Sequence, residues 1–426
     1  MIEELYQHYL SHPKISTDTR KIEKDSIFFA LKGPNFDANK FADQALESGA
    51  ALCVVDDESV VKNNKYFLVE DCLSALQDLA RHHRKQLAIP IIGLTGSNGK
   101  TTSKELVAIA LKPKYNVFAT QGNLNNHIGV PLSILSITDD HEIAVIEMGA
   151  NHVGEIGFLC TISNPSHGYI TNIGKAHLEG FGGIEGVIRG KSELYHHLIQ
   201  HNGIVWINSN NEILFNMAKR FKNPLFYPNA GDFYHCEFKG ANPDVEFEAE
   251  NGKVYKSHLV GAYNFENIAT ALCVAKYFGV EEEEANKAVA SYAPENNRSQ
   301  VIKKGSNTII LDAYNANPTS MEKAIENIAL INAENKVVIL GDMKELGDES
   351  IKEHERIGEL LKEKNIKNVY FCGIEIKPAL NTFPNAKYFE SRNDLMDAIK
   401  SDKISESTIL IKASRSIGLE KVLEVF

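Results

Sequence analysis

The stretch Gly93-Leu-Thr-Gly-Ser-Asn-Gly-Lys-Thr-Thr102 decides the fold of the central part of this chain. The apolar run at residues 89–94 predicts a buried strand, and residues 101–111 predict a helix. A glycine-rich turn between strand and helix lets backbone N–H groups converge on phosphate oxygens, and the helix N-terminus adds partial positive charge. The stretch therefore predicts a phosphate-binding loop for a nucleoside triphosphate.

Within this loop, Lys100 is placed to reach the β- and γ-phosphates of ATP, and the Thr101 hydroxyl to hold Mg²⁺. The usual pattern has a glycine five residues before Gly99, where this chain has Leu94. The alternative interpretation is a glycine-rich turn that binds no ligand. It is the weaker interpretation, because Gly-Lys-Thr-Thr follows a buried strand here. The predicted ATP-binding residues of the loop are Gly96, Ser97, Asn98, Gly99, Lys100, Thr101 and Thr102.

Length and composition limit the class of protein. At about 150 residues per domain, 426 residues predict about three domains. The 43% hydrophobic and 24% charged residues are typical of a soluble globular protein. The net charge of −11 repels anions, so a nucleotide must be held by local groups and metal, and nucleic acid is not an expected partner.

The cysteines and the N-terminus indicate the compartment. The six cysteines include no C-x-x-C pair, which favours a reducing compartment and argues against a zinc site. The start, Met1-Ile-Glu-Glu-Leu5, is acidic and lacks the apolar region of a signal peptide, and no window approaches eighteen apolar residues. We therefore expect a cytoplasmic protein without a membrane span, and a monomer, because nothing indicates an obligate oligomer.

The pattern of elements predicts an α/β protein of three domains. Residues 1–85 form a small α/β domain, residues 86–296 a central P-loop-type ATPase domain with a mostly parallel sheet, and residues 297–426 a Rossmann-like, doubly wound domain. Residues 224–260 are more irregular and β-leaning. The expected strands, beyond the one before the phosphate loop, are residues 26–31, 51–55, 66–69, 116–119, 143–147, 169–172, 203–208, 308–312, 336–340, 368–372 and 408–411.

Polar residues follow several of these strands. Asn123, Asn125 and Asn126 can donate and accept hydrogen bonds to a polar ligand, and an ordinary Asn-rich turn is an equal alternative. Glu147 ends an apolar strand, at the sheet edge where ligands bind in open α/β folds, and predicts a Mg²⁺ ligand over a helix-capping carboxylate. His177 follows the next strand, where a metal or phosphate role and a structural role are evenly matched.

Three further positions depend on a closing domain arrangement. Asn267 lies in the first turn of a helix at residues 264–278, with Asn264 as its N-cap, where its amide could contact a base. Arg298 lies between two blocks and could clamp a phosphate, or be an ordinary surface arginine. Asp312 ends a strand and could hold a ribose hydroxyl or a substrate that bears a cation.

Together these segments resemble the Mur ligase family of cell-wall enzymes. The resemblance covers nearly the whole chain and makes the loop with Leu94 the family's own form. The motifs that carry it are Leu94-Thr-Gly-Ser-Asn-Gly-Lys-Thr-Thr, Gly122-Asn-Leu-Asn-Asn, Glu147-Met-Gly-Ala, Thr171-Asn-Ile-Gly-Lys-Ala-His-Leu-Glu, Asp312-Ala-Tyr-Asn-Ala-Asn-Pro and Gly341-Asp-Met-Lys-Glu-Leu-Gly347.

The turn Tyr314-Asn-Ala-Asn-Pro318 favours the member that joins D-alanyl-D-alanine to UDP-N-acetylmuramoyl-tripeptide. The resemblance implies that ATP phosphorylates the tripeptide carboxylate and that the amine of the dipeptide attacks the acyl phosphate. It does not identify the third peptide residue, L-Lys or a diaminopimelate.

The resemblance also implies site roles. Lys100, His177 and Lys191 are implied to be catalytic, with Thr101 and Glu147 on one Mg²⁺ and His177 on a second. Lys191 matches a family lysine that can be carbamylated and would then be a metal ligand, whereas on its own it reads as a solvated helix lysine. Asn267 is implied at adenine, Arg298 near ribose or phosphates, and Asp312 near ribose.

The first domain resembles a UDP-binding domain, which implies substrate contacts from Thr17, Asp18 and Arg20, together with Asn123, Asn125 and Asn126 of the central domain. One departure from the family pattern is Ala38-Asn39, where Gly-His is usual. Two other functions remain open: a folylpolyglutamate synthase-like ligase, which shares the ATPase core, and a nucleotide-dependent switch or scaffold without ligase activity.

Overall fold

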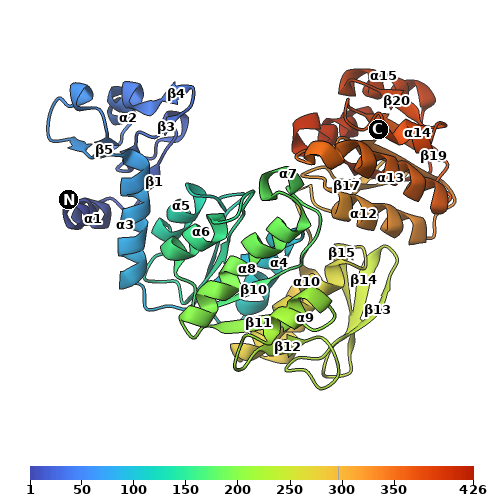
Figure 1. The fold of residues 1–426 in the computed structure, drawn as a ribbon, viewed down its shortest axis with the longest axis horizontal. Coiled ribbons are helices and arrows are strands. Elements are labelled where there is room, and N and C mark those ends of the chain that lie inside the picture. Colours follow the sequence, from blue (N-terminus) through green and yellow to red (C-terminus); the bar gives the residue numbers. More distant parts are fainter. Residues whose placement is uncertain (296) are drawn as a thin grey trace.

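The computed structural model describes residues 1–426 with the exception of residue 296. Three α/β units follow one another across the molecule, blue, green to yellow, and orange to red in Figure 1. Each contains its own mainly parallel sheet. The predicted α/β fold with three units is therefore confirmed, while the boundaries at residues 85/86 and 296/297 stay a prediction.

The first unit is a four-stranded parallel sheet in the order β1-β2-β5-β6, with a separate hairpin β3-β4. The long helix α3 connects it to the central unit (Figure 1) and begins at a cap, where the Asp71 side chain accepts a hydrogen bond from Ser74 N at 2.7 Å. Its elements are α1 (Ile2–Ser11), β1 (Ile15–Ser16), β2 (Ile27–Phe29), β3 (Lys32–Gly33), β4 (Phe36–Asp37), α2 (Ala42–Glu47), β5 (Leu52–Val55), β6 (Tyr66–Leu68) and α3 (Cys72–Gln86).

The central unit has a six-stranded parallel sheet in the order β12-β11-β10-β7-β9-β8. Strands β7 and β9 are buried along their whole length, as expected where helices cover both faces. Its elements as far as β12 are β7 (Ile91–Thr95), α4 (Lys100–Leu111), β8 (Val117–Ala119), α5 (Gly129–Leu135), β9 (Ile143–Glu147), α6 (Glu155–Ser163), β10 (His167–Ile170), α7 (Leu178–Phe181), α8 (Ile184–Gln200), β11 (Ile204–Asn208), α9 (Glu212–Ala218) and β12 (Leu225–Tyr227).

The β-leaning stretch at residues 224–260 contains β12 and a separate antiparallel sheet in the order β13-β14-β15. Two helices follow it, and α10 packs against α4, the helix that begins at the phosphate loop. These elements are β13 (Glu237–Ala241), β14 (Asp244–Glu248), β15 (Val254–Val260), α10 (Asn264–Tyr277) and α11 (Glu282–Ser291).

The third unit has the sheet order β16-β17-β21-β18-β19-β20, parallel except for the edge pair β16-β17. The chain skips from β17 to β18 and returns as β21 between them, so the carboxyl ends of these three strands border a switch point where ligands bind in such sheets. Its elements are β16 (Gln300–Lys304), β17 (Asn307–Asp312), α12 (Pro318–Leu330), β18 (Lys336–Gly341), α13 (Ser350–Glu363), β19 (Asn368–Cys372), α14 (Ala379–Thr382), β20 (Lys387–Phe389), α15 (Arg392–Asp402) and β21 (Thr408–Lys412).

Two local predictions need correction. The strand expected at residues 169–172 ends at Ile170, because Thr171 and Asn172 turn to contact the phosphate loop. Asn264 is the first residue of α10 and not its N-cap, since its side chain donates backwards to Val260 O at 2.8 Å and Tyr263 holds the cap position. Among the described residues, none of the helices is both long and apolar enough to cross a membrane.

Candidate active site

A cavity of about 480 Å³ lies between the central and third units. Most of the predicted nucleotide and metal residues line it, although they come from distant parts of the chain. Gly96, Thr101 and Lys191 are not among its lining residues, and Thr17, Asp18 and Arg20 lie in the first unit after β1. The predicted site residues that line the cavity are Ser97, Asn98, Gly99, Lys100, Thr102, Asn123, Asn125, Asn126, Glu147, His177, Asn267, Arg298 and Asp312.

Two glycines of the phosphate loop are required by space and backbone conformation. Gly96 has a φ of +148°, and a Cβ atom there would lie 1.9 Å from Thr171 Oγ1. Gly99 has a φ of +76°, and a Cβ atom there would lie 3.0 Å from Asn267 Oδ1 on α10. The loop is therefore packed against two other segments of the central unit.

The segment after β10 forms hydrogen bonds with the phosphate loop. Asn172 accepts from Ser97 N through its backbone oxygen and from Asn98 N through its side chain, both at 3.0 Å. The Ser97 hydroxyl donates to Gly174 O at 3.0 Å. Since these two loop amides are used internally, we expect phosphate to be bound mainly by the amides of the first turn of α4.

The first intrahelical bond of α4 runs from Ser103 N to Gly99 O at 2.8 Å, so the amides before it lie at an open helix N-terminus. Lys100 bends back over the loop and donates to Gly96 O at 2.9 Å. Burial lowers the pKa of the Lys100 ammonium group, and the Glu147 carboxylate acts in the opposite direction.

Two oxygens next to the loop are prepared for a cation. Glu147 is 1% exposed at the end of β9, and its Oε1 accepts from Asn125 Nδ2 at 2.8 Å. Its Oε2 is buried and has no hydrogen-bond partner among the described residues, and the same holds for the hydroxyl of Thr101. Buried polar atoms are normally satisfied, so these two oxygens fit a hard cation such as Mg²⁺.

The three asparagines after β8 have different positions. Asn125 orients Glu147, as described above. Asn126 accepts from Ile128 N at 3.1 Å and Gly129 N at 2.8 Å, so its side chain holds the start of α5. Asn123 is exposed at the rim of the cavity. The side chains of Asn125 and Asn126 thus have contacts within the protein, and ligand contact by any of the three asparagines stays a prediction.

The side chains of His177 and Lys191 both have polar contacts within the protein. His177 adopts a left-handed backbone (φ 53°) before α7, and its Nδ1 contacts Glu345 of the third unit. Lys191, 1% exposed on α8, donates to Ala150 O at 3.0 Å and lies 4.9 Å from the centre of the Phe181 ring. Burial, with Lys100 nearby, holds the pKa of Lys191 well below its usual range. Among the described residues no cluster of three His, Cys, Asp or Glu side chains could hold a metal.

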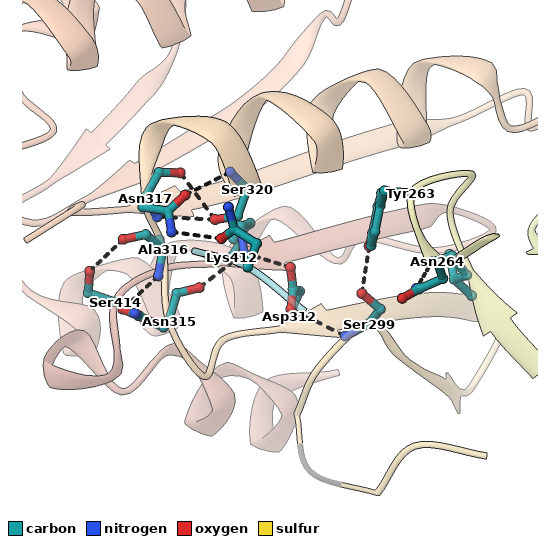
Figure 2. A network of polar contacts seen from close by, with 12 residues as sticks. Tyr263, Asn264, Ser299, Asp312, Asn315, Ala316, Asn317, Ser320, Lys412 and Ser414 are labelled. Carbon is teal, nitrogen blue, oxygen red and sulfur yellow. Dashed lines mark hydrogen bonds and ion pairs between the residues drawn. The ribbon is translucent and has the colours of Figure 1, made fainter. Parts of the chain in front are cut away.

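The third unit contributes the far wall of the cavity. The guanidinium carbon of Arg298 lies 3.8 Å from the centre of the Tyr314 ring, and its Nε is buried with no hydrogen-bond partner in the described part of the chain. Asn317 caps α12 by accepting from Ser320 N at 2.9 Å and donates to Asn98 Oδ1 of the phosphate loop at 2.7 Å (Figure 2 shows the cap). The Asn-Pro turn therefore contacts the loop directly.

In the first unit, the Asp18 carboxylate accepts from Arg20 N at 3.0 Å and from its guanidinium at 2.7 Å, which lowers the pKa of Asp18 to about 2. Asn39, at the position that departs from the family pattern, is 1% exposed and donates to Asp56 Oδ1 at 2.7 Å. Its amide is therefore used inside the unit.

Sequence reasoning missed several residues around the cavity. Lys104 is buried and donates to Thr120 O at 2.6 Å, while Thr120 Oγ1 accepts from Glu147 N at 3.0 Å. Lys412 is buried at the end of β21 and pairs with Asp312. Lys412 ends the apolar run Ile409-Leu-Ile411, and that placement was the available signal for its buried charge, whereas Lys104 follows polar residues and had no such signal.

Comparison with known proteins agrees with this geometry. The chain matches the Mur ligase middle domain over residues 94–275 and the Mur ligase, glutamate ligase domain over residues 297–415. It is 34% identical to the UDP-N-acetylmuramoyl-tripeptide--D-alanyl-D-alanine ligase of Bacillus subtilis, over 96% of this chain and 92% of the relative.

Among solved structures, the MurF ligase of Thermotoga maritima in complex with ADP is similar with a TM-score of 0.86 and 31% identity, covering 98% of this chain and 97% of the other. A folylpolyglutamate synthase of Mycobacterium tuberculosis has a TM-score of 0.63 at 15% identity, covering 83% of this chain and 94% of the other, a likeness of fold alone. The motifs, the sheets and these matches agree that the chain belongs to the Mur ligase family.

Proposed function

We propose that this chain is an ATP-dependent ligase that joins D-alanyl-D-alanine to UDP-N-acetylmuramoyl-tripeptide. The observation that carries the proposal is the near full-length similarity to a relative with that activity in its name. The cavity supports it, because residues of the phosphate loop, the Glu147 carboxylate and residues of the third unit line one space.

The reaction has two steps. A carboxylate oxygen of the tripeptide attacks the γ-phosphorus of ATP, which releases ADP and leaves an acyl phosphate. The dipeptide amine then attacks the acyl carbon, loses a proton, and expels phosphate to give the amide. Because a carboxylate and a triphosphate are both anionic, the site must supply positive charge, and Lys100 lies at the loop to do so.

Mg²⁺ would be held at Thr101 and Glu147, the residues whose buried oxygens lack partners. Bound there, it would offset the charge of the phosphates. Asn125 orients the Glu147 carboxylate and leaves its second oxygen available. His177 is proposed for a second Mg²⁺, although in this arrangement its Nδ1 is engaged by Glu345 and only its other nitrogen is available.

Carbamylation of Lys191 is part of the proposal. An amine adds CO₂ only when it is neutral, releasing a proton and becoming an anionic carbamate. The lowered pKa of Lys191 increases the neutral fraction at a given pH, and no carboxylate pairs with its ammonium group among the described residues. Replacing CO₂-containing buffer by CO₂-free buffer should lower the rate, and bicarbonate should restore it.

For the nucleotide, we propose that Asn267 contacts adenine, Arg298 the ribose or phosphates, and Asp312 the ribose. All three line the same cavity as the phosphate loop. We further propose that Thr17, Asp18 and Arg20 bind the UDP part of the substrate, and that Asn123 contacts the peptide at the rim.

We place the protein in the cytoplasm, where ATP is present, and its six free cysteines, all buried, suit a reducing compartment. A monomer is proposed as well, and light scattering of the purified protein would measure its mass.

Phosphate release tests the proposed function. With ATP present, we expect release only when both UDP-N-acetylmuramoyl-tripeptide and D-alanyl-D-alanine are added, and a panel of tripeptides would identify the third residue. Release with folate and glutamate instead would replace the proposal by the folylpolyglutamate alternative. Nucleotide binding without any amide product would favour a switch or scaffold.

A further inference from the structure

A buried lysine lies at the edge of the third unit that faces the cavity. Lys412 is 2% exposed, and its Nζ donates to Asp312 Oδ2 at 2.6 Å and to Asn315 O at 3.0 Å. Figure 2 shows the ammonium group between these two partners. A fully buried lysine is rare unless it is paired, so its position needs an explanation.

The sheet register explains how the pair forms. Strands β17 and β21 are parallel neighbours, and Asp312 and Lys412 are Cα partners at the last step of this ladder. The two side chains therefore meet at the carboxyl edge of the sheet, beside the switch point where the chain order reverses. Both residues line the nucleotide cavity.

One arm of the network leads to the central unit. Asp312 Oδ1 accepts from Ser299 N at 3.3 Å, and the Ser299 hydroxyl contacts Tyr263 OH at 2.6 Å (Figure 2). Tyr263 precedes α10, the helix that carries Asn267. The Asp312 carboxylate is thus fixed between a cation of its own unit and the segment that connects the two units.

The second arm leads to the phosphate loop. Lys412 fixes the backbone oxygen of Asn315 in the turn after β17. Two residues later, Asn317 donates to Asn98 Oδ1 at 2.7 Å. The same ammonium group therefore holds the carboxylate proposed at the ribose and the turn that touches the loop.

We infer that Lys412 is a positioning residue for the nucleotide site, fixing both the Asp312 carboxylate and the Asn315 turn against the phosphate loop. The inference rests on the proposed role of Asp312 at the ribose. A buried ion pair contributes little net stability compared with an apolar pair of the same size, so stability alone does not account for it. Both partners instead border the cavity, where orientation matters.

A double-mutant cycle on ADP affinity tests the inference. We measure binding of ADP with Mg²⁺ by calorimetry for Lys412→Met, Asp312→Asn and the double variant. Each single change should weaken binding by about tenfold, and the double variant should lose clearly less than the roughly hundredfold product of the two, because contacting residues are not additive. A small loss beyond that of Asp312→Asn is expected, since Lys412 also fixes Asn315 O. KM for ATP should rise while KM for the UDP-tripeptide stays unchanged.

A control variant and a second pair of variants complete the binding experiment. Lys387→Met removes another lysine of the third unit, whose Nζ pairs with Asp402 Oδ2 at 2.8 Å and which does not line the cavity. This variant should leave ADP affinity unchanged. Lys412→Met leaves the half-buried Asp312 without its cation and can fail to fold, in which case Asp312→Asn and the double variant are compared directly.

A further tenfold loss of ADP affinity on adding Lys412→Met to Asp312→Asn would overturn the inference, as would normal binding by Lys412→Met. If Asp312→Asn itself binds ADP normally, the ribose role of Asp312 fails, which is a separate failure of the proposed site. An equal rise of both KM values would indicate a purely structural lysine.

Discussion

Two sheet edges face the same cavity, and their carboxylates are satisfied differently. At the central edge, Glu147 has one oxygen bound by Asn125 and one without a partner among the described residues, and the Thr101 hydroxyl likewise has none there. At the third unit's edge, both oxygens of Asp312 accept hydrogen bonds, from Lys412 and from Ser299. The first edge is prepared to bind a cation, whereas the second already contains its own.

This difference in hydrogen bonding predicts different roles for the two edges. An unpartnered buried oxygen is unfavourable until a ligand arrives, so we expect the central edge to gain most from binding of the proposed Mg²⁺ and phosphate. A satisfied carboxylate is rigid and can still accept a hydroxyl, so we expect the third unit's edge to orient the nucleotide. Substitutions at the central edge should therefore affect the chemical step more strongly than substitutions at the other.

The largest effect is expected for Lys100→Ala. It removes the cation that lies over the phosphate loop, so we expect turnover to fall by about a hundredfold to a thousandfold, since a transition-state donor contributes on this scale. Binding of the UDP-substrate, measured by calorimetry, should remain, because the residues proposed for it lie in the first unit.

Lys112→Ala is the matched control, because this exposed lysine lies at the other end of α4. It should retain full activity. If Lys100→Ala also loses UDP-substrate binding, the first unit does not bind that substrate independently. A variant that keeps more than a tenth of wild-type turnover would contradict the role of Lys100.

An intermediate effect is expected for Asn125→Ala. Its amide orients the Glu147 carboxylate, and loss of such an outer contact typically weakens metal affinity by about 10–100-fold. The Mg²⁺ concentration that gives half-maximal phosphate release should rise accordingly. Gln121→Ala, an exposed change in the same loop, should leave it unchanged, and an identical response of both variants would argue against a metal at Glu147.

The sequence predicted the central edge better than the third unit's edge. Lys100, Thr101 and Glu147 each follow or end a strand in a local pattern, and a strand–loop–helix unit fixes its own geometry. Asp312 was identified for the same reason. Its partner Lys412 was not, because pairing two strand ends requires the order of strands, and β21 is inserted between β17 and β18 from the end of the chain.

Local sequence patterns also did not predict the contacts between loops. Ser97 and Asn98 belong to the phosphate motif, yet their amides are bound by Asn172, which follows a different strand. The pairing of His177 with Glu345 joins two units and depends on how they lie against each other. Local sequence carries residue type and periodicity, whereas such contacts depend on tertiary placement.

The smallest effect is expected for Asn317→Ala, which tests whether the contact between the two edges is mainly structural. The change removes the cap of α12, and lost caps typically lower the free energy of unfolding by about 1 kcal/mol. It also removes the bond to Asn98. Urea unfolding should show the loss, with only a small rise in KM for ATP.

Asn317→Asp distinguishes the two contacts, because its carboxylate keeps the cap and suits a helix N-terminus. It can also accept from the Asn98 amide nitrogen, which is buried without a partner, if that amide turns over. Stability should therefore return to the wild-type value. A KM for ATP that stays raised in Asn317→Asp would mean that donation by Asn317 to the loop matters beyond the cap, and would make the third unit's edge a direct partner of the phosphate loop.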